Sequence, residues 1–124
     1  MTDTKKLTAS NLKYLLALLC LDTDGTGVRC VRVADSLGIS KPSVHNMMNT
    51  FIEMELISKA SYGRAVFTSE GRAVAERYSR YYDAVSALLG KAMPEITDVS
   101  AATYALLASL TEDELSRLVT EEHS

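Results

Sequence analysis

The chain has 124 residues, of which 47% are hydrophobic and 23% are charged, and its formal net charge is -3 with a pI near 5.3. These values are ordinary for one globular domain, or for one small domain with an appendage, and they exclude wholesale disorder. Apolar stretches stay shorter than the roughly 20 residues of a membrane span, and the polar N-terminus does not resemble a signal peptide. We therefore expect a cytoplasmic protein with no membrane partner.

Charge is distributed unevenly along the chain. Residues 1–80 carry 11 Lys and Arg against 8 Asp and Glu, a net of +3, whereas residues 81–124 carry 2 against 8, a net of −6. This pattern favours a module that faces nucleic acid, followed by a segment turned away from phosphate. Cys20 and Cys30 are too few and too widely spaced for a disulfide framework or a four-ligand zinc site, so two reduced, buried thiols are expected.

The chain is expected to start with a buried helix. Either Thr8 or Ser10 can cap this helix, and the turn-forming residues 22–27 end it. Its apolar residues recur at helical spacing: Leu12, Leu15, Leu16 and Leu19. Residues 28–31 then predict a short edge strand, and residues 31–37 a second helix.

A tight turn at Gly38 and Ile39 leads to a third helix, which Ser40 caps and which runs to about Met54. The inward face of this helix comprises Val44, Met47 or Met48, Phe51 and Met54. The opposite face comprises Ser43, His45, Asn46, Asn49 and Thr50. An exposed helix is about 10–12 Å across and fits the major groove of DNA.

Two short β-rich pieces follow, residues 56–60 and residues 65–67, and residues 61–64 predict the hairpin connection between them. Helix, helix, tight turn, helix and hairpin is the order of a winged helix-turn-helix. The free face of the third helix can then approach base edges, while Lys59 and Arg64 of the hairpin can approach the phosphate backbone or the minor groove.

Thr68 is expected to cap a long helix that ends near Leu89, because Gly90 follows. Its apolar stripe comprises Val74, Tyr78, Tyr81 or Tyr82, Val85 and Leu88. After a linker at 91–98, residues 99–110 predict an apolar helix. Residues 111–114 match a capping box, which opens the last helix.

The predicted fold is mainly α. A winged helix-turn-helix DNA-binding domain occupies residues 1–72, and a linking helix with a small helical dimerisation segment occupies residues 73–124. One recognition helix reads only about 4–6 base pairs, and two-fold symmetry doubles that number. The apolar helix at 99–110 also carries more hydrophobic surface than a monomer of this size hides easily. We therefore expect a homodimer formed through the segment after residue 80.

Residues 33–44, which read Val-Ala-Asp-Ser-Leu-Gly-Ile-Ser-Lys-Pro-Ser-Val, resemble the helix-turn-helix of the iron-dependent repressors. This is the family of the diphtheria toxin repressor and the manganese transport regulator. Residues 67–72, Phe-Thr-Ser-Glu-Gly-Arg, resemble the junction between wing and long helix in that family. The resemblance implies a dimer that binds a palindromic operator with Mn(II) or Fe(II) as corepressor. It also implies a short form of the family, without the SH3-like domain.

The resemblance assigns DNA contacts to four positions at the start of the third helix: Ser40, Pro42, Ser43 and Asn46. Lys41 joins them because its ammonium group can contact phosphate, and His45 because it lies on the same exposed face. With Lys59 and Arg64 from the hairpin, these residues form the predicted site for a double-stranded DNA operator.

The metal ligands of that family do not carry over. The family's ligand positions fall here on Tyr81, on Tyr104, Leu107 and Ala108, and in the first helix on Leu12, Lys13, Leu15 or Leu16. Mn(II) and Fe(II) prefer carboxylate, imidazole or water, which these side chains do not offer. No metal cofactor is therefore expected. The tyrosine cluster, Tyr78, Tyr81, Tyr82 and Tyr104, predicts core or dimer packing, with a ligand pocket as the alternative.

Two other functions remain open at this point. A winged-helix module for protein–protein assembly would carry acidic or large apolar groups on its reading face, whereas Lys41, Lys59 and Arg64 flank a polar helix here. A regulator of the multiple-antibiotic-resistance type shares the Thr-x-x-Gly junction at 68–71 and would respond to an organic ligand. No constellation for catalysis is present, so no enzyme is expected. The sequence predicts a dimeric, sequence-specific DNA-binding transcriptional regulator that acts as a repressor.

Overall fold

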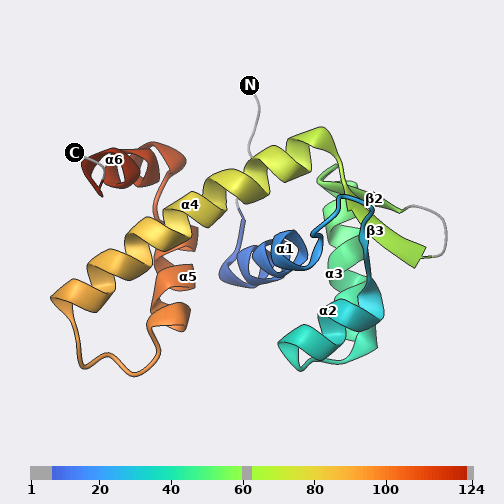
Figure 1. The fold of residues 1–124 in the computed structure, drawn as a ribbon, viewed down its shortest axis with the longest axis horizontal. Helices are drawn as coiled ribbons and strands as arrows, with labels where there is room; N and C mark the ends of the chain where they lie inside the picture. Colours follow the sequence, from blue (N-terminus) through green and yellow to red (C-terminus); the bar gives the residue numbers. More distant parts are fainter. Residues whose placement is uncertain (1–6, 60–62, 123–124) are drawn as a thin grey trace. The chain divides into compact units, whose positions relative to one another are not determined.

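The computed structural model describes residues 7–59 and 63–122. Its elements, shown in Figure 1, are α1 (Ala9–Leu21), β1 (Val28–Arg29), α2 (Cys30–Leu37), α3 (Lys41–Glu53), β2 (Ile57–Lys59), β3 (Arg64–Phe67), α4 (Ser69–Ala92), α5 (Val99–Ser109) and α6 (Glu112–Glu122). The chain divides into two compact units. Lys13–Glu76 form the helix-turn-helix unit. The residues up to Leu12, together with those from Arg77 onward, form the helical unit.

Helix α1 starts at a reciprocal cap. The hydroxyl oxygen of Thr8 accepts the backbone N–H of Asn11, and the side-chain oxygen of Asn11 accepts the N–H of Thr8, both at 3.0 Å. Thr8 is therefore the cap, not Ser10, because its hydroxyl satisfies an N–H that the first turn leaves free. Leu12, Leu15 and Leu18 of α1 are buried, as the spacing predicts. Leu19 is only half-buried. Cys20 was expected to be buried and to widen the stripe together with Leu18, but Cys20 is exposed and Cys30 is half-buried.

Helices α2 and α3 are joined by the predicted tight turn. Gly38 ends α2 in the left-handed conformation, with a φ of 67°, and both Gly38 and Ile39 donate their N–H groups to the carbonyl of Ala34. This pattern satisfies the last carbonyls of a helix, and the positive φ favours glycine. Helix α3 packs against α2 and β2. Met48 is the buried methionine of the two that the sequence left open.

A three-stranded antiparallel sheet forms the wing, with the strand order β1-β3-β2. Val28 pairs with Ala65, and Lys59 pairs with Ala65 from the other side. The predicted edge strand at 28–31 is confirmed but shorter, because α2 already begins at Cys30. The hairpin connection was predicted at residues 61–64, but Arg64 is already the first residue of β3, where it pairs with Arg29. Residues 60–62 lie outside the described residues.

Thr68 caps α4 as predicted and also hydrogen-bonds to the two residues that precede β2, Glu55 and Leu56. Its hydroxyl oxygen accepts the N–H of Gly71 at 2.9 Å and donates to the carbonyl of Glu55 at 2.8 Å. Gly71 lies directly against the backbone of Leu56, so that a Cβ at this position would overlap the carbonyl of Leu56. The start of α4 is thus fixed by close backbone contact.

The predicted end of α4 is wrong. The helix continues through Gly90 to Ala92, and the N–H of Met93 still bonds to the carbonyl of Leu89 at 2.8 Å. Glycine in a helix costs only about 1 kcal/mol relative to alanine, which is too little to stop a helix unless a positive φ is needed. Leu88, which was expected in the buried stripe, is exposed.

Asp22 anchors the loop between α1 and β1. Its side chain is only 1% exposed, accepts the N–H of Gly27 at 3.1 Å, and forms an ion pair with Arg72 at 2.8 Å. A buried carboxylate is tolerated only when it is paired and hydrogen-bonded, and both partners are present here. The loop is thereby fixed to the first turn of α4.

The helical unit combines two capped helices with the second half of α4. The predicted capping box is confirmed: the N–H of Glu114 donates to the hydroxyl of Thr111 at 3.1 Å, and the N–H of Thr111 donates to the carboxylate of Glu114 at 2.9 Å. Asp98, which the sequence analysis missed, caps α5 through the N–H of Ala101. Leu107 and Leu115 are buried.

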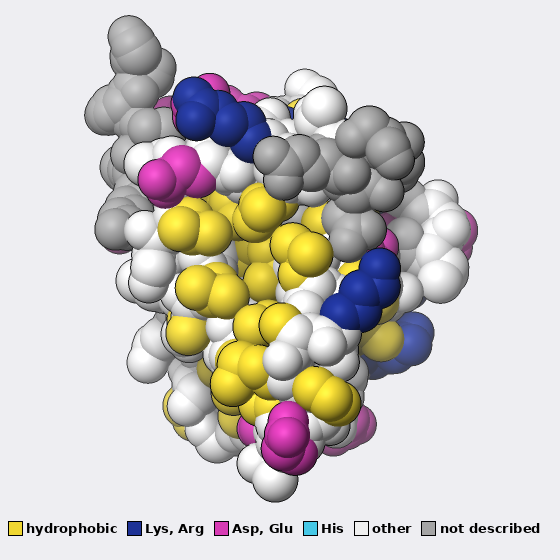
Figure 2. All heavy atoms as spheres, turned by 90° about the vertical axis from the view of Figure 1, so that its left-hand side faces the viewer, with side chains coloured by type: hydrophobic (Ala, Val, Ile, Leu, Met, Phe, Trp, Pro, Cys, Tyr) yellow, Lys and Arg dark blue, Asp and Glu magenta, His cyan; other side chains and the backbone are white. Residues whose placement is uncertain are grey.

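One face of the helical unit is strongly apolar. Figure 2 shows yellow side chains gathered over the side that carries the end of α4, α5 and α6. Of the large apolar residues that the structure describes, those classed as exposed are Val31, Leu88 and Met93, and the last two belong to this unit. No described helix combines the length and the hydropathy that a membrane crossing needs. The fold is mainly α with a winged helix-turn-helix, as predicted.

Two glycines of α4 allow a matched test of the contact with Leu56. Gly71→Ala is expected to lower the free energy of unfolding by about 2–4 kcal/mol, because the new methyl group overlaps a backbone carbonyl. Gly90→Ala, with no neighbouring atom within 4 Å of the added Cβ, is expected to raise it by about 0.5–1 kcal/mol. Urea denaturation of both variants measures the difference, and equal effects of the two substitutions would contradict this account.

Candidate DNA-binding site

The start of α3 is organised by the side chain of Ser40. Its hydroxyl oxygen accepts the N–H of Ser43 at 3.3 Å and its hydroxyl group donates to the hydroxyl of Ser43 at 2.9 Å. Pro42 lies in the first turn, where a missing N–H costs nothing. The cap and the proline together fix where the helix begins and therefore which side chains face outward.

Burial of one face of α3 leaves the other face free. Val44, Met48 and Phe51 are completely buried. Six of the eight predicted site residues lie together on the exposed start of the helix: Ser40, Lys41, Pro42, Ser43, His45 and Asn46. The segment from Lys41 to Ile52 contains no acidic residue, so nothing on this stretch would repel phosphate.

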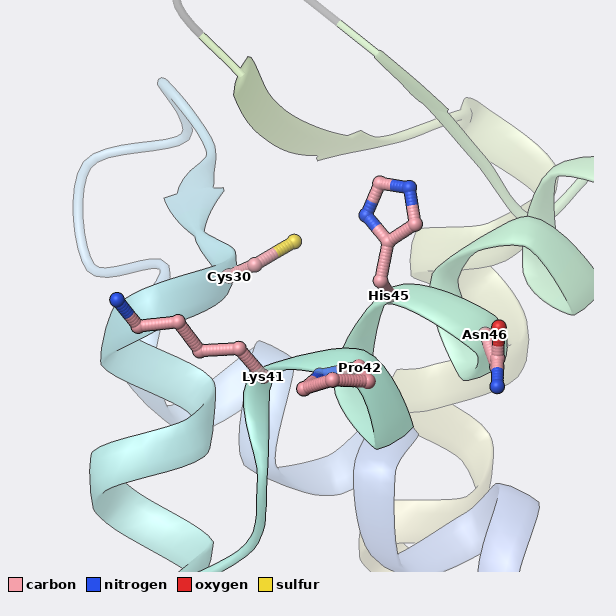
Figure 3. A pocket seen from close by; sticks show the side chains of 5 residues that line it. All are labelled: Cys30, Lys41, Pro42, His45 and Asn46. Carbon is pink, nitrogen blue, oxygen red and sulfur yellow. The ribbon is translucent and has the colours of Figure 1, made fainter.

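A hollow of about 410 Å³ opens beside these residues, between the starts of α2 and α3. It is lined by Cys30, Lys41, Pro42, His45 and Asn46 (Figure 3). In Figure 3 the thiol of Cys30 points toward the side where the imidazole of His45 lies, and the Lys41 side chain extends away from α3. Cys30 was not predicted as a site residue, because the sequence placed it in a strand rather than in the first turn of α2.

The two wing residues of the predicted site differ in their surroundings. Lys59 is exposed at the end of β2. Arg64 is half-buried at the start of β3, where its guanidinium donates to the hydroxyl of Thr26 at 3.5 Å and to the carbonyl of Gly27 at 3.4 Å. Part of its hydrogen-bonding capacity therefore holds the loop between α1 and β1, whereas Lys59 is the more accessible cation.

Arg29 and Arg32 are further exposed cations that the sequence analysis missed. Arg29 lies directly opposite Arg64 in the sheet register. The sequence contained a signal for both, because Arg29 belongs to the short strand at 28–29 and Arg32 follows three residues later, at the start of α2. Asp24 is the exposed acidic residue of the adjoining loop, in which Asp22 is buried. Hydrogen bonds from the side chain and N–H of Thr26 hold the pKa of the Asp24 carboxyl below its usual value, so it is ionised at neutral pH.

Two neighbouring serines separate stability from contact. Ser40→Ala removes the helix cap and is expected to lower the free energy of unfolding by about 1 kcal/mol. Ser43→Ala keeps the backbone N–H that the cap uses and removes only the exposed hydrogen bond between the two hydroxyl groups. It is expected to change stability by less than about 0.5 kcal/mol. Thermal or urea denaturation distinguishes the two. A larger loss for Ser43→Ala than for Ser40→Ala would show that the cap is assigned to the wrong residue.

Comparison with known proteins is consistent with this architecture. Residues 13–61 match the IclR helix-turn-helix domain family. No curated protein matches the chain. Among solved structures, IdeR of T. acidophilum is 18% identical, with a TM-score of 0.69, over 100% of this chain and 56% of its own. The manganese regulator SloR is 16% identical, with a TM-score of 0.77, over 97% and 55%. ZitR of Lactococcus lactis is 19% identical, with a TM-score of 0.59, over 100% and 80%.

The chain thus spans about half the length of IdeR and SloR. At these identities the likeness is one of fold, and at that level the predicted resemblance to the iron-dependent repressors is confirmed. The matched domain belongs to transcription regulators rather than to enzymes. The chain carries a helix-turn-helix DNA-binding domain within the fold of the metal-dependent regulators.

Proposed function

We propose that the chain is a homodimeric transcriptional repressor that reads a DNA operator with α3. The observation that carries the proposal is the exposed, acid-free start of α3, whose opposite face is completely buried. A helix held in this way can enter the major groove without disturbing the core. The fold that the chain shares with IdeR and SloR, the latter named a manganese regulator, supports the same class of function.

The side chains of α3 divide into two roles. Ser43 and Asn46 carry hydroxyl and amide groups that can donate to and accept from base edges, so they would supply sequence preference. Lys41 carries a point charge suited to a phosphate, which fixes position without reading sequence. Ser40 and Pro42 place this turn, and His45 extends the same face toward the hollow beside Cys30.

The wing would contribute further phosphate contacts. Lys59 is exposed on β2, and the guanidinium groups of Arg29 and Arg64 belong to residues paired across the sheet. These cations supply local positive charge for phosphate on α3 and the wing, although the helix-turn-helix unit as a whole is neutral, with 7 Lys and Arg against 7 Asp and Glu, and the full chain is acidic. The charge distribution therefore favours DNA as the partner over a purely protein-binding role. A protein-binding face would carry acidic or large apolar groups, which the exposed start of α3 lacks.

The second element of the proposal is a dimer formed by the helical unit. Helix α5 fully buries only Thr103 and Leu107, although most of its residues are apolar. Figure 2 shows apolar side chains gathered on one face of this unit, rather than scattered singly as on an ordinary surface. Leu88 and Met93 are exposed large apolar residues of the same unit. A second copy of the chain would cover this face and would present two copies of α3 to a two-fold symmetric operator.

Substitutions on α3 test the DNA contacts against an operator selected from random duplexes. Lys41→Ala is expected to weaken binding to every duplex and to lower the slope of log affinity against log salt by about one unit. Asn46→Ala and Ser43→Ala are expected to relax sequence preference, at about 1–3 kcal/mol per lost base contact. Fluorescence anisotropy titrations at several salt concentrations measure both quantities.

Lys91→Ala is the matched control, because this exposed lysine belongs to the helical unit. Its affinity and salt slope should equal those of the unaltered chain. The assigned face is wrong if Lys41→Ala, Ser43→Ala, Asn46→Ala and Arg64→Ala all bind operator DNA as the unaltered chain does. Repression is checked by transcription in vitro from a promoter that contains the selected operator, where added protein should lower the transcript level.

Charge introduced into the apolar face tests the dimer. Leu88→Lys and Met93→Lys are expected to convert the dimer to a monomer at tens of micromolar, because a buried ammonium without a partner opposes association. Val31→Lys is the control, since Val31 is equally exposed but lies in the helix-turn-helix unit. Light scattering gives the mass of each. A monomeric unaltered chain at the same concentration would refute the dimer.

A further inference from the structure

The resemblance to the iron-dependent repressors implies a Mn(II) or Fe(II) ion, and the residues of this chain do not fit one. The matched ligand positions hold phenol and hydrocarbon side chains: Tyr81, Tyr104, Leu107 and Ala108. Within residues 7–59 and 63–122, no three or more His, Cys, Asp or Glu side chains come together in a way that could hold a metal ion.

Tyr81, at one of these matched positions, takes part in a half-buried ion pair between α4 and α6. Glu112, the first residue of α6, accepts two hydrogen bonds from Arg77 of α4, with Nε–Oε2 at 3.0 Å and Nη2–Oε1 at 3.2 Å. The hydroxyl of Tyr81, one turn further along α4, donates to Oε2 at 2.9 Å. Both carboxylate oxygens are therefore bound to α4, and the pairing with the guanidinium is bidentate.

The electrostatics agree with a carboxylate that stays ionised. Partial burial raises the pKa of Glu112, but the hydrogen bonds from Arg77 and Tyr81 outweigh burial, and the pKa lies below its usual value. Burial, followed by the charge of Glu112, raises the pKa of Tyr78 to about 12. Burial likewise raises the pKa of Tyr81, so its hydroxyl keeps the proton that it donates. The ring of Tyr81 is held edge-on against that of Tyr78, with the centroids 5.1 Å apart.

We infer that Arg77, Glu112 and Tyr81 form a permanent latch, in which a tethered guanidinium takes the place of an exchangeable metal ion. The guanidinium neutralises a carboxylate and joins two helices, as a bound cation does, but it cannot dissociate from the chain. The arrangement of α4 and α6 is therefore independent of divalent metal. If the chain binds DNA as proposed above, then DNA binding is independent of divalent metal as well, and this consequence rests on the proposed function.

A second ion pair of α6 provides an internal comparison. Arg117 pairs with Asp113 at 2.8 Å, but both side chains are about three quarters exposed (73% and 76%) and both belong to α6 itself. Arg77 and Glu112 are about half as exposed (40% and 39%) and connect two helices. An exposed pair within one helix contributes little, so only the pair between helices should hold α6 in place.

Hydrogen exchange of the full chain, read by mass spectrometry, tests the latch without DNA. Arg77→Met is expected to accelerate amide hydrogen exchange in residues 112–120 about fivefold. Arg117→Met should leave the exchange rate of the same residues unchanged. Tyr81→Phe removes one hydrogen bond and keeps the ring, and should give a smaller acceleration in the same peptide. If Arg77→Met unfolds the chain, Tyr81→Phe still provides this readout. Exchange in residues 112–120 equal to that of the unaltered chain, in whichever of these two variants folds, would overturn the inference.

Metal addition and removal form the second arm of the test. EDTA, or Mn(II) up to about 1 mM, far above the micromolar range of a sensor site, should change neither the exchange of α6 nor DNA affinity. A stoichiometric Mn(II) site that slows the exchange or strengthens DNA binding would overturn the inference. Failure of the proposed function alone gives a different result. DNA binding is then absent both with and without metal, while Arg77→Met still accelerates amide exchange in residues 112–120.

Discussion

Complete burial of one side of α3 is the constraint on which the proposed function depends. Val44, Met48 and Phe51 have no solvent exposure, and their spacing determines how the helix is rotated about its axis. Once that rotation is fixed, Lys41, His45 and Asn46 can only face outward. The cap at Ser40 sets the register of the helix, and Gly38 sets its angle to α2 by adopting a positive φ.

Local chemistry made much of this fold predictable. Ser40, Thr68 and Thr111 all cap the helices that they were expected to cap. Of the two candidates for the first helix, Thr8 and Ser10, the structure selects Thr8. A cap depends on a hydroxyl and the next three residues, so the sequence contains nearly all the information. The location of the candidate site on α3 follows from the same cap together with the apolar period of the helix.

What could not be predicted depends on contacts between distant residues. Gly90 was expected to end α4, but it does not adopt a positive φ and α4 continues through it. Gly71 looked unremarkable, yet the backbone of Leu56 lies against it. Arg64 was expected in the hairpin connection, positioned to approach DNA, but it begins β3 and its guanidinium donates to Thr26 and Gly27. The Arg77–Glu112 pair spans 35 positions in sequence, too far for spacing to reveal it.

The apolar face of the helical unit has a consequence for how such a regulator would respond to the cell. A metal ion binds or dissociates as its concentration in the cell changes, whereas the guanidinium of Arg77 is always attached to the chain. Arg77 therefore cannot make DNA binding depend on the concentration of a metal ion. If two copies must meet through the face around Leu88 and Met93 before DNA is bound, mass action makes the population of pairs grow with the square of the amount of protein while monomers predominate. The quantity that the chain measures is then its own abundance, and its rate of synthesis and degradation becomes the signal.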